Sequence, residues 1–192
     1  MRTMIRIWLP LVALLVGLGG AGVASAQYLV EEAGLRFPDQ IGAAQQSGGR
    51  RYPQPGLGHG IDYRGQGYGA SIYVYDRGLS GIPDGTASEI VRTEFARARS
   101  DIFAVQRQQN APEPRLVRER LVKVDGVEFL TASYRFVRGD TDALSLVAMT
   151  GLRRNFIKVR ISTRASEGDE AQARLDGFLQ DFSRFLADAG SR

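Results

Sequence analysis

Two segments of the chain place apolar side chains at the three- and four-residue steps of an amphipathic helix. The positions are Val91, Phe95, Ala98, Ile102 and Val105 in the first segment and Ala171, Leu175, Phe178, Phe182 and Phe185 in the second. Thr86 and Glu89 have the spacing of a capping box ahead of the first, and Asp169 can cap the second. The pattern predicts two long helices, each covering an apolar layer.

Around these helices the apolar positions alternate with polar ones or run continuously, as they do in strands. The runs cover residues 35–37, 61–64, 70–76, 116–124, 127–137, 144–150 and 155–163. The run over 144–149 is apolar on both parities, which is typical of a strand covered on both sides. Asp125-Gly126 suits a tight hairpin turn. We expect an α+β domain with a largely antiparallel β-sheet of six to seven strands, packed with two amphipathic helices.

Residues 45–58 interrupt the strand pattern with polar residues, glycines and prolines. Such a composition buries little apolar surface, and glycine and proline punctuate turns, so we expect a mobile loop here. The sequence shows no internal repeat, and the length of the segment 27–192 suits one soluble domain with a real core.

The first 26 residues have the parts of a secretory signal peptide. Arg2 and Arg6 precede an apolar run that ends in Ala24-Ser25-Ala26, the small-x-small pattern that signal peptidase accepts. The sequence therefore predicts cleavage between Ala26 and Gln27. It also predicts a periplasmic or secreted mature protein.

An uncleaved membrane anchor is the alternative interpretation of this leader. No charged residue lies between Arg6 and Glu31, and so long a stretch could span a bilayer. Pro10 and several glycines weaken a spanning helix, and the small-x-small sequence has no role in an anchor. These features favour cleavage, and we expect no membrane anchor afterwards.

Composition narrows the possible chemistry. The chain contains no cysteine and a single histidine, so disulfides, a lipoprotein anchor and metal sites built on Cys or His ligands are excluded. The net charge of +4 includes two arginines of the leader, and the nearly neutral remainder does not favour nucleic acid as a partner. The glycine clusters match no dinucleotide or Walker pattern, so no cofactor is expected.

His59 carries the enzymatic alternative. A Ser-His-Asp hydrolase would need His59 as its base, with Ser71 and either Asp62 or Asp76 as the nearest partners along the chain. The Gly-x-Ser-x-Gly elbow of many hydrolases does not occur. Because His59 adjoins the polar stretch, we expect it to be a solvent-exposed loop residue.

Strand alternation gathers polar side chains into one candidate binding face. If the β-branched residues of each strand point to a helix layer, the residues between them point to the other side of the sheet. This rule predicts a shared face for Tyr73, Tyr75, Arg135, Lys158 and Arg160. Tyrosine and arginine combine contact area with polar tips, so the face suits an envelope protein partner or an anionic ligand. The alternatives are an ordinary solvated face and burial under the 45–58 loop.

In the order and length of its elements, the segment from about Leu35 to Leu186 is similar to the PsbP-like fold. That fold is an antiparallel sheet flanked by helices, used by extrinsic photosystem proteins and by bacterial and nuclear-transport adaptors. A narrower set of residues resembles a family of uncharacterised exported bacterial proteins: Leu35-Arg36-Phe37-Pro38, residues 73–79, Ile82-Pro83-Asp84-Gly85, Phe95 and Asp101-Ile102. The second resemblance implies export.

Together these features predict an exported, non-catalytic binding or accessory domain whose ligand the sequence does not name. The alternative is an unrecognised hydrolase that uses His59.

Overall fold

The computed structural model describes residues 27–138, 141–165 and 168–190. The predicted signal peptide, up to Ala26, lies outside these residues. Within them, no helix is both long and apolar enough to cross a bilayer.

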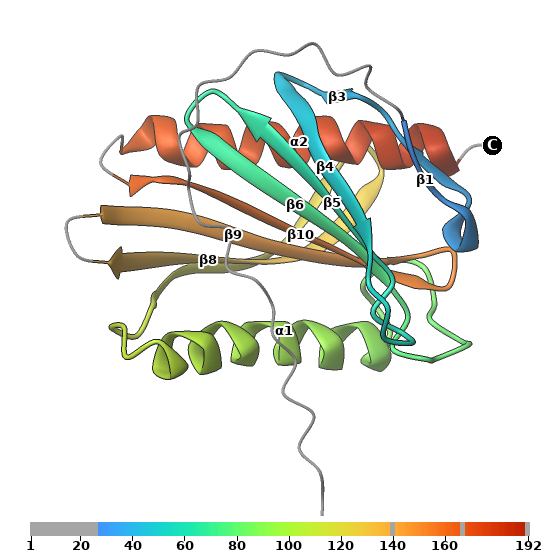
Figure 1. The fold of residues 1–192 in the computed structure, drawn as a ribbon, viewed down its shortest axis with the longest axis horizontal. Coiled ribbons are helices and arrows are strands. Elements are labelled where there is room, and N and C mark those ends of the chain that lie inside the picture. The colour runs from blue at the N-terminus through green and yellow to red at the C-terminus, as the bar shows by residue number, and fades with distance from the viewer. Residues whose placement is uncertain (1–26, 139–140, 166–167, 191–192) are drawn as a thin grey trace, which may run out of the picture.

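An antiparallel sheet of eight strands lies between two helices, one on each face (Figure 1). Its strands run in the order β3-β4-β5-β6-β10-β9-β8-β7. Their bounds are β3 Gln40–Ile41, β4 Ala44–Arg51, β5 His59–Gly65, β6 Tyr68–Tyr75, β7 Arg115–Val124, β8 Val127–Arg138, β9 Thr141–Leu152 and β10 Asn155–Arg164. The helices are α1, Glu89–Gln108, and α2, Asp169–Gly190. A second, two-stranded sheet joins β1, Tyr28–Val30, to β2, Leu35–Phe37, through the short 3-10 helix η1, Glu31–Ala33.

The predicted α+β class and the two flanking helices are confirmed. The main sheet exceeds the predicted six to seven strands because residues 40–51 form β3 and β4. The prediction of a loop over 45–58 is therefore wrong for residues 45–51. β4 pairs with β5 through a register shift between Gln46 and Gly48, and a Cβ at Gly49 would come within 2.2 Å of the Tyr28 ring. Backbone pairing and this close ring contact support a strand that buries few side chains of its own.

The N-cap of the first helix lies two residues after the predicted one. Ser88 is the N-cap, and its hydroxyl accepts the Val91 N–H at 3.3 Å. Thr86 is buried instead and donates its hydroxyl to Glu128 of β8. The capping residue thus differs from the predicted one although the helix and its apolar side were predicted.

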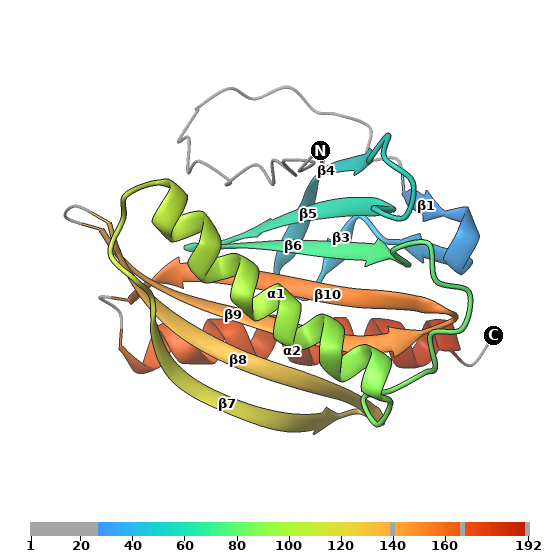
Figure 2. The same cartoon turned by 90° about the horizontal axis from the view of Figure 1, so that it is seen from below.

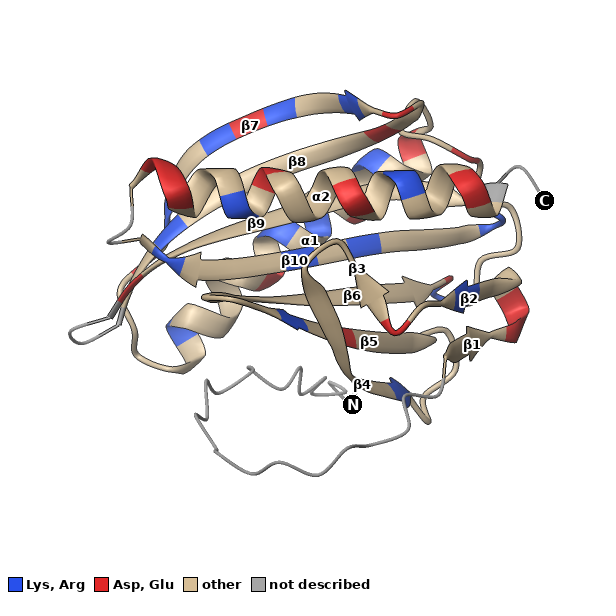
Figure 3. Ribbon diagram, turned by 90° about the horizontal axis from the view of Figure 1, so that it is seen from above, with Lys and Arg blue, Asp and Glu red and all other residues tan. Residues whose placement is uncertain are grey.

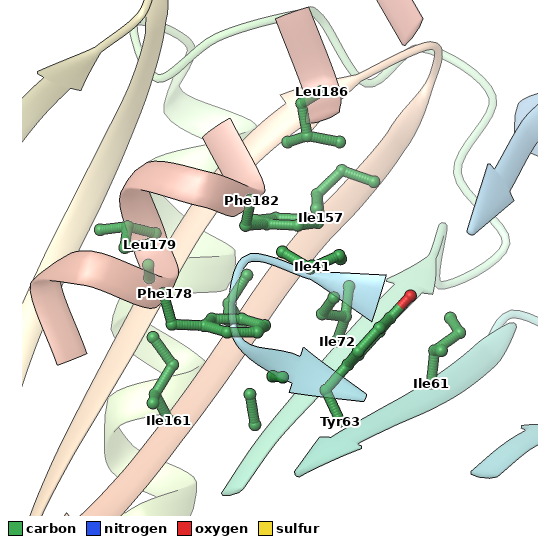
Figure 4. Packing of buried hydrophobic residues seen from close by; sticks show 14 of the residues in the cluster. Ile41, Ile61, Tyr63, Ile72, Ile157, Ile161, Phe178, Leu179, Phe182 and Leu186 are labelled. Atoms are coloured by element: carbon green, nitrogen blue, oxygen red, sulfur yellow. The ribbon is translucent and has the colours of Figure 1, made fainter. Parts of the chain in front are cut away.

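The core on the α2 side is the larger of two. Phe178, Phe182 and Leu186 of α2 pack on isoleucines of β6 and β10, as Figure 4 shows. The Phe178 and Phe182 rings are stacked, with centroids 6.4 Å apart. The sheet side of this core includes Ile72, Ile157, Val159 and Ile161, all almost fully buried.

The core on the α1 side is formed by Val91, Phe95 and Ala98 against the other face of the sheet. β9 contributes to both cores: Leu146 and Ala148 point to α2, whereas Val147 and Met149 point to α1. The two-sided apolar pattern of residues 144–149 is explained by this arrangement. Because both faces of the sheet are covered, residues that alternate with a buried set can be buried as well.

Candidate functional site

Four of the five predicted face residues lie together on two neighbouring strands. Tyr73 and Tyr75 belong to β6, and Lys158 and Arg160 belong to β10. Lys158 stands directly opposite Tyr73 in the ladder. All four side chains are on the sheet face opposite the one that carries the isoleucines of the α2-side core.

Arg135 lies on the other face, so the prediction that it shares the face is wrong. It stands opposite Leu144, which belongs to the α2-side core. Its exposed guanidinium donates to Asp142, with Nε 2.9 Å from Oδ1 and 2.8 Å from Oδ2. The prediction failed because the apolar residues that alternate with Arg135, such as Tyr134, face α1 and not α2. On a strand that is covered from both sides, the apolar residues at alternate positions share a face, but the pattern does not show which helix that face meets.

The shared face is covered, and the expectation of an open polar face is also wrong. Helix α1 crosses it diagonally over β8 and β9 (Figure 2). Tyr73 and Tyr75 are 9% and 5% exposed, and Lys158 and Arg160 are half-buried. Helix α1 supplies most of this cover, and Tyr52 of the 45–58 segment also packs against the cluster that contains Tyr73 and Tyr75.

Tyr75 serves the packing of α1. Its hydroxyl donates to Glu94 of α1 at 2.8 Å, and Arg77 Nε donates to the same carboxylate oxygen at 2.9 Å. Burial, and after it the Glu94 carboxylate, raises the pKa of Tyr75 well above its usual value. Because its hydroxyl is occupied and its ring is buried, Tyr75 can contribute only a wall to a binding site.

Lys158 is a cation held among aromatic rings. Its Nζ lies 4.4 Å from the centroid of the Tyr73 ring and 5.4 Å from that of Tyr75. No carboxylate of a described residue is within ion-pair distance of it. Burial lowers the pKa of Lys158 to about 8, and the more distant carboxylates of Glu94 and Asp101 oppose this shift.

Arg160 is the second cation, two residues further along β10. Its guanidinium lies 5.8 Å from the Phe136 ring centroid and makes no hydrogen bond or ion pair with a described residue. Burial lowers the pKa of Arg160. Among the described residues, the side-chain polar atoms that are fully buried without a hydrogen-bond partner are Asp39 Oδ1 and Gln46 Oε1. The nitrogens of Lys158 and Arg160 also lack a partner among these residues but are not in this group. They therefore retain contact with water.

Asp62 of β5, the strand next to β6, already has two hydrogen-bond partners. Asp62 Oδ1 accepts the Ser71 hydroxyl at 2.6 Å, and Asp62 Oδ2 accepts Arg50 Nη1 at 2.7 Å. Arg50 Nε also donates to the Tyr52 hydroxyl at 3.0 Å. Since Ser71 stands opposite Arg160, this network borders the two cations and leaves Arg160 without an anionic partner.

His59 is buried, contrary to the expected exposed loop position. It is the first residue of β5 and 7% exposed. Its Nδ1 lies 3.0 Å from the Tyr28 hydroxyl, and its Nε2 lies 3.1 Å from Glu32 Oε2. With Arg51 it lines an open cavity of about 490 Å³.

The hydrolase arrangement does not form around His59 in the described part of the chain. Its hydrogen-bond partners are a tyrosine and a glutamate, and Ser71 and Asp62 bond to each other instead. Asp76 accepts the Gly78 N–H at 2.7 Å. Across residues 27–138, 141–165 and 168–190, no three His, Asp or Glu side chains are grouped so that they could hold a metal ion.

The sequence missed the contacts of His59 for a physical reason. Tyr28 and Glu32 come from β1 and η1, elements of three residues each, which are too short to give a periodic signal. They reach His59 only because the small β1–β2 sheet folds beside β4.

Comparison with known proteins identifies the fold. No family model and no curated protein match the chain. Among solved structures, it is similar to cyanobacterial PsbP (CyanoP) from Synechocystis sp. PCC 6803, with 20% identity, 87% of this chain and 96% of that chain covered, and a TM-score of 0.50. A protein of unknown function from Pseudomonas aeruginosa, PA94, has 14% identity, coverage of 81% and 93%, and a TM-score of 0.38. The chain has a PsbP-like fold, as its element order predicted.

Proposed function

We propose that this chain is an exported, non-catalytic binding or accessory domain that holds an anionic group at Tyr73, Lys158 and Arg160, called here the Lys158–Arg160 site. The observation that carries the proposal is the pair of half-buried, water-accessible cations with no anionic partner among the described residues. Side chains two residues apart on a strand are separated by about 7 Å. A phosphate, sulfate or carboxylate group can accept hydrogen bonds from both at this spacing.

The energetics of the site favour a functional role over a structural one. An unpaired cation that is partly removed from water lowers the stability of the fold, and polar residues in such places are usually paired. An apolar residue at either position would supply almost the same packing as Lys158 or Arg160. Residues that lower the stability of the fold in this way are common where they act on a ligand.

The fold supports an accessory rather than a catalytic role. The PsbP-like fold is used by extrinsic and adaptor proteins, which act by binding. The ligand can be a small anion or an acidic or phosphorylated group on an envelope protein, because the Lys158–Arg160 site would recognise the same chemistry in each.

Binding is tested by titrating the purified mature protein with inorganic phosphate, sulfate or acetate while amide chemical shifts are recorded. Arg160→Met should weaken binding at least tenfold, because a hydrogen bond between charged groups contributes about 1.5–3 kcal/mol. Arg36→Met, at an exposed position of β2, is the matched control and should leave binding unchanged. If Arg160→Met binds the anions as the parent protein does, the assigned site is wrong.

Export is tested separately by mass spectrometry of the protein from extracytoplasmic fractions. The residues Arg2, Arg6 and Ala24-Ser25-Ala26 predict a product that begins at Gln27. Ala24→Arg with Ala26→Arg should prevent cleavage, because the peptidase subsites accept only small side chains. If the parent protein, like the variant, is recovered only as the full-length chain in the membrane fraction, the chain is not exported as a free domain.

A further inference from the structure

The two edges of the main sheet differ in length and cover. One edge is β3, a strand of two residues that lies beside α2. The other edge is β7, with ten residues. Figure 3 shows β7 along the rim of the sheet, with no described element on its outer side. A strand in this position leaves alternate backbone N–H and C=O groups without a partner, and such groups can pair with another chain.

The side chains of β7 are exposed together with its backbone. All ten residues are exposed or half-buried. Leu116, Val117 and Leu121 are 43%, 47% and 57% exposed. Val117 occupies a register shift between Leu116 and Arg118, so the ladder with β8 is regular from Arg118 to Val124. This regular stretch can accept a further strand.

The charge of β7 selects the kind of strand. It contains four basic residues, Arg115, Arg118, Arg120 and Lys123, and one acidic residue, Glu119. Arg120 pairs with Asp176 of α2, and Glu119 pairs with Arg99 of α1. Arg115 and Arg118 form no ion pair with a described residue. A second copy of β7 would bring like charges together, whereas an acidic strand would be attracted.

The register places Arg118 and Arg120 on one face of β7 and Leu121 on the other, where Lys123 lies as well. Arg118 and Arg120 stand opposite Ser133 and Thr131, on the sheet face that carries α2. Leu121 stands opposite Leu130, on the face that carries α1. A complementary segment would therefore alternate acidic residues, for the α2 face, with apolar residues, for the α1 face.

We propose that β7 binds an extended acidic segment of a partner protein as an added strand of the sheet. Backbone hydrogen bonds supply the pairing, the arginines select acidic side chains, and Leu121 packs against an apolar residue of the segment. This surface is separate from the Lys158–Arg160 site and does not depend on it.

The test uses a fluorescent, acetylated peptide of five Val-Glu repeats and the purified mature protein. Arg115→Glu with Arg118→Glu should weaken binding at least tenfold, because two attractions become repulsions. Arg36→Glu with Arg97→Glu makes the same charge change at exposed positions of β2 and α1 and should bind as the parent does. Arg160→Met should also bind as the parent does, which separates this proposal from the Lys158–Arg160 site.

A second peptide isolates the backbone pairing. It has the same sequence, with N-methyl groups on alternate residues, so it keeps the charges but loses donors along one edge. Strand addition predicts loss of binding by this peptide and slower amide exchange along β7 with the unmodified one. Equal binding by both peptides would overturn strand addition. If Arg36→Glu with Arg97→Glu weakens peptide binding as much as Arg115→Glu with Arg118→Glu does, the arginines of β7 do not select the acidic peptide. If the protein dimerises through β7 and the dimer excludes the peptide, the occupant of this edge is a second copy of the chain.

Discussion

Lys158→Met should raise the free energy of unfolding by about 3 kcal/mol at neutral pH. The pKa of Lys158 is about 8 in the folded protein, against about 10.4 for an unperturbed lysine, and each unit corresponds to about 1.4 kcal/mol. Methionine keeps the apolar stem against the Tyr73 and Tyr75 rings without a charge. Urea unfolding of both proteins measures the difference.

The gain should depend on pH in a defined direction. Between the folded pKa of about 8 and the unfolded pKa of about 10.4, the unfolded chain binds more protons at Lys158, so the stability of the parent protein rises with pH. Below the folded pKa Lys158 is protonated in both the folded and the unfolded state, so the full cost of burying its charge remains. The advantage of Lys158→Met is therefore constant at neutral and acidic pH and shrinks as the pH passes through this window.

Lys123 provides the control, because Lys123 and Lys158 are the only lysines of the chain. Lys123 is an exposed residue of β7, so Lys123→Met should change stability by less than about 0.5 kcal/mol. With two lysines, NMR can follow the titration of each side-chain amine, and Lys158→Met assigns the signals. If Lys158→Met gives no more stability than Lys123→Met, Lys158 is not destabilising. A stable variant that no longer binds anions would show that the protein retains Lys158 for its ligand.

Periodicity explains why most of the fold could be predicted. The three- and four-residue steps of Val91, Phe95 and Ala98 mark one side of α1, and these residues are the ones that pack on the sheet. The turn at Asp125-Gly126 has positive φ at both residues, which that dipeptide tolerates. In these segments the local preference and the tertiary environment agree, so the sequence alone is sufficient.

Where tertiary contacts decide, the sequence was insufficient. β4 is polar and contains glycines, and it forms a strand because β5 and the Tyr28 ring lie beside it. Alternation correctly separated Lys158 from Ile157, but it could not show that α1 covers the side of Lys158 or that Arg135 faces α2. Period-two patterns assign side chains to two faces and do not state what covers either face.

Glu94→Ala should lower the free energy of unfolding by about 3 kcal/mol or more. Glu94 is 6% exposed and accepts hydrogen bonds from both Tyr75 and Arg77. Its removal leaves the half-buried Arg77 guanidinium and the enclosed Tyr75 hydroxyl without their partner, and breaking a buried pair in this way typically costs about 3–5 kcal/mol. Glu89→Ala, at an exposed position in the first turn of α1, should cost no more than about 1 kcal/mol.

The same substitution tests the electrostatics of the Lys158–Arg160 site. The Glu94 carboxylate raises the pKa of Lys158 against the effect of burial, so its loss should move that pKa further below its value in the parent protein. Glu94→Gln keeps an acceptor for Tyr75 and Arg77 but no charge, so it should lower the pKa of Lys158 with a smaller loss of stability. An unchanged Lys158 titration in both variants would mean that Glu94 and Lys158 do not interact. If the pKa of Lys158 is lowered in both variants, the Glu94 carboxylate of α1 helps to keep Lys158 charged, and a charged Lys158 is what a bound anion needs.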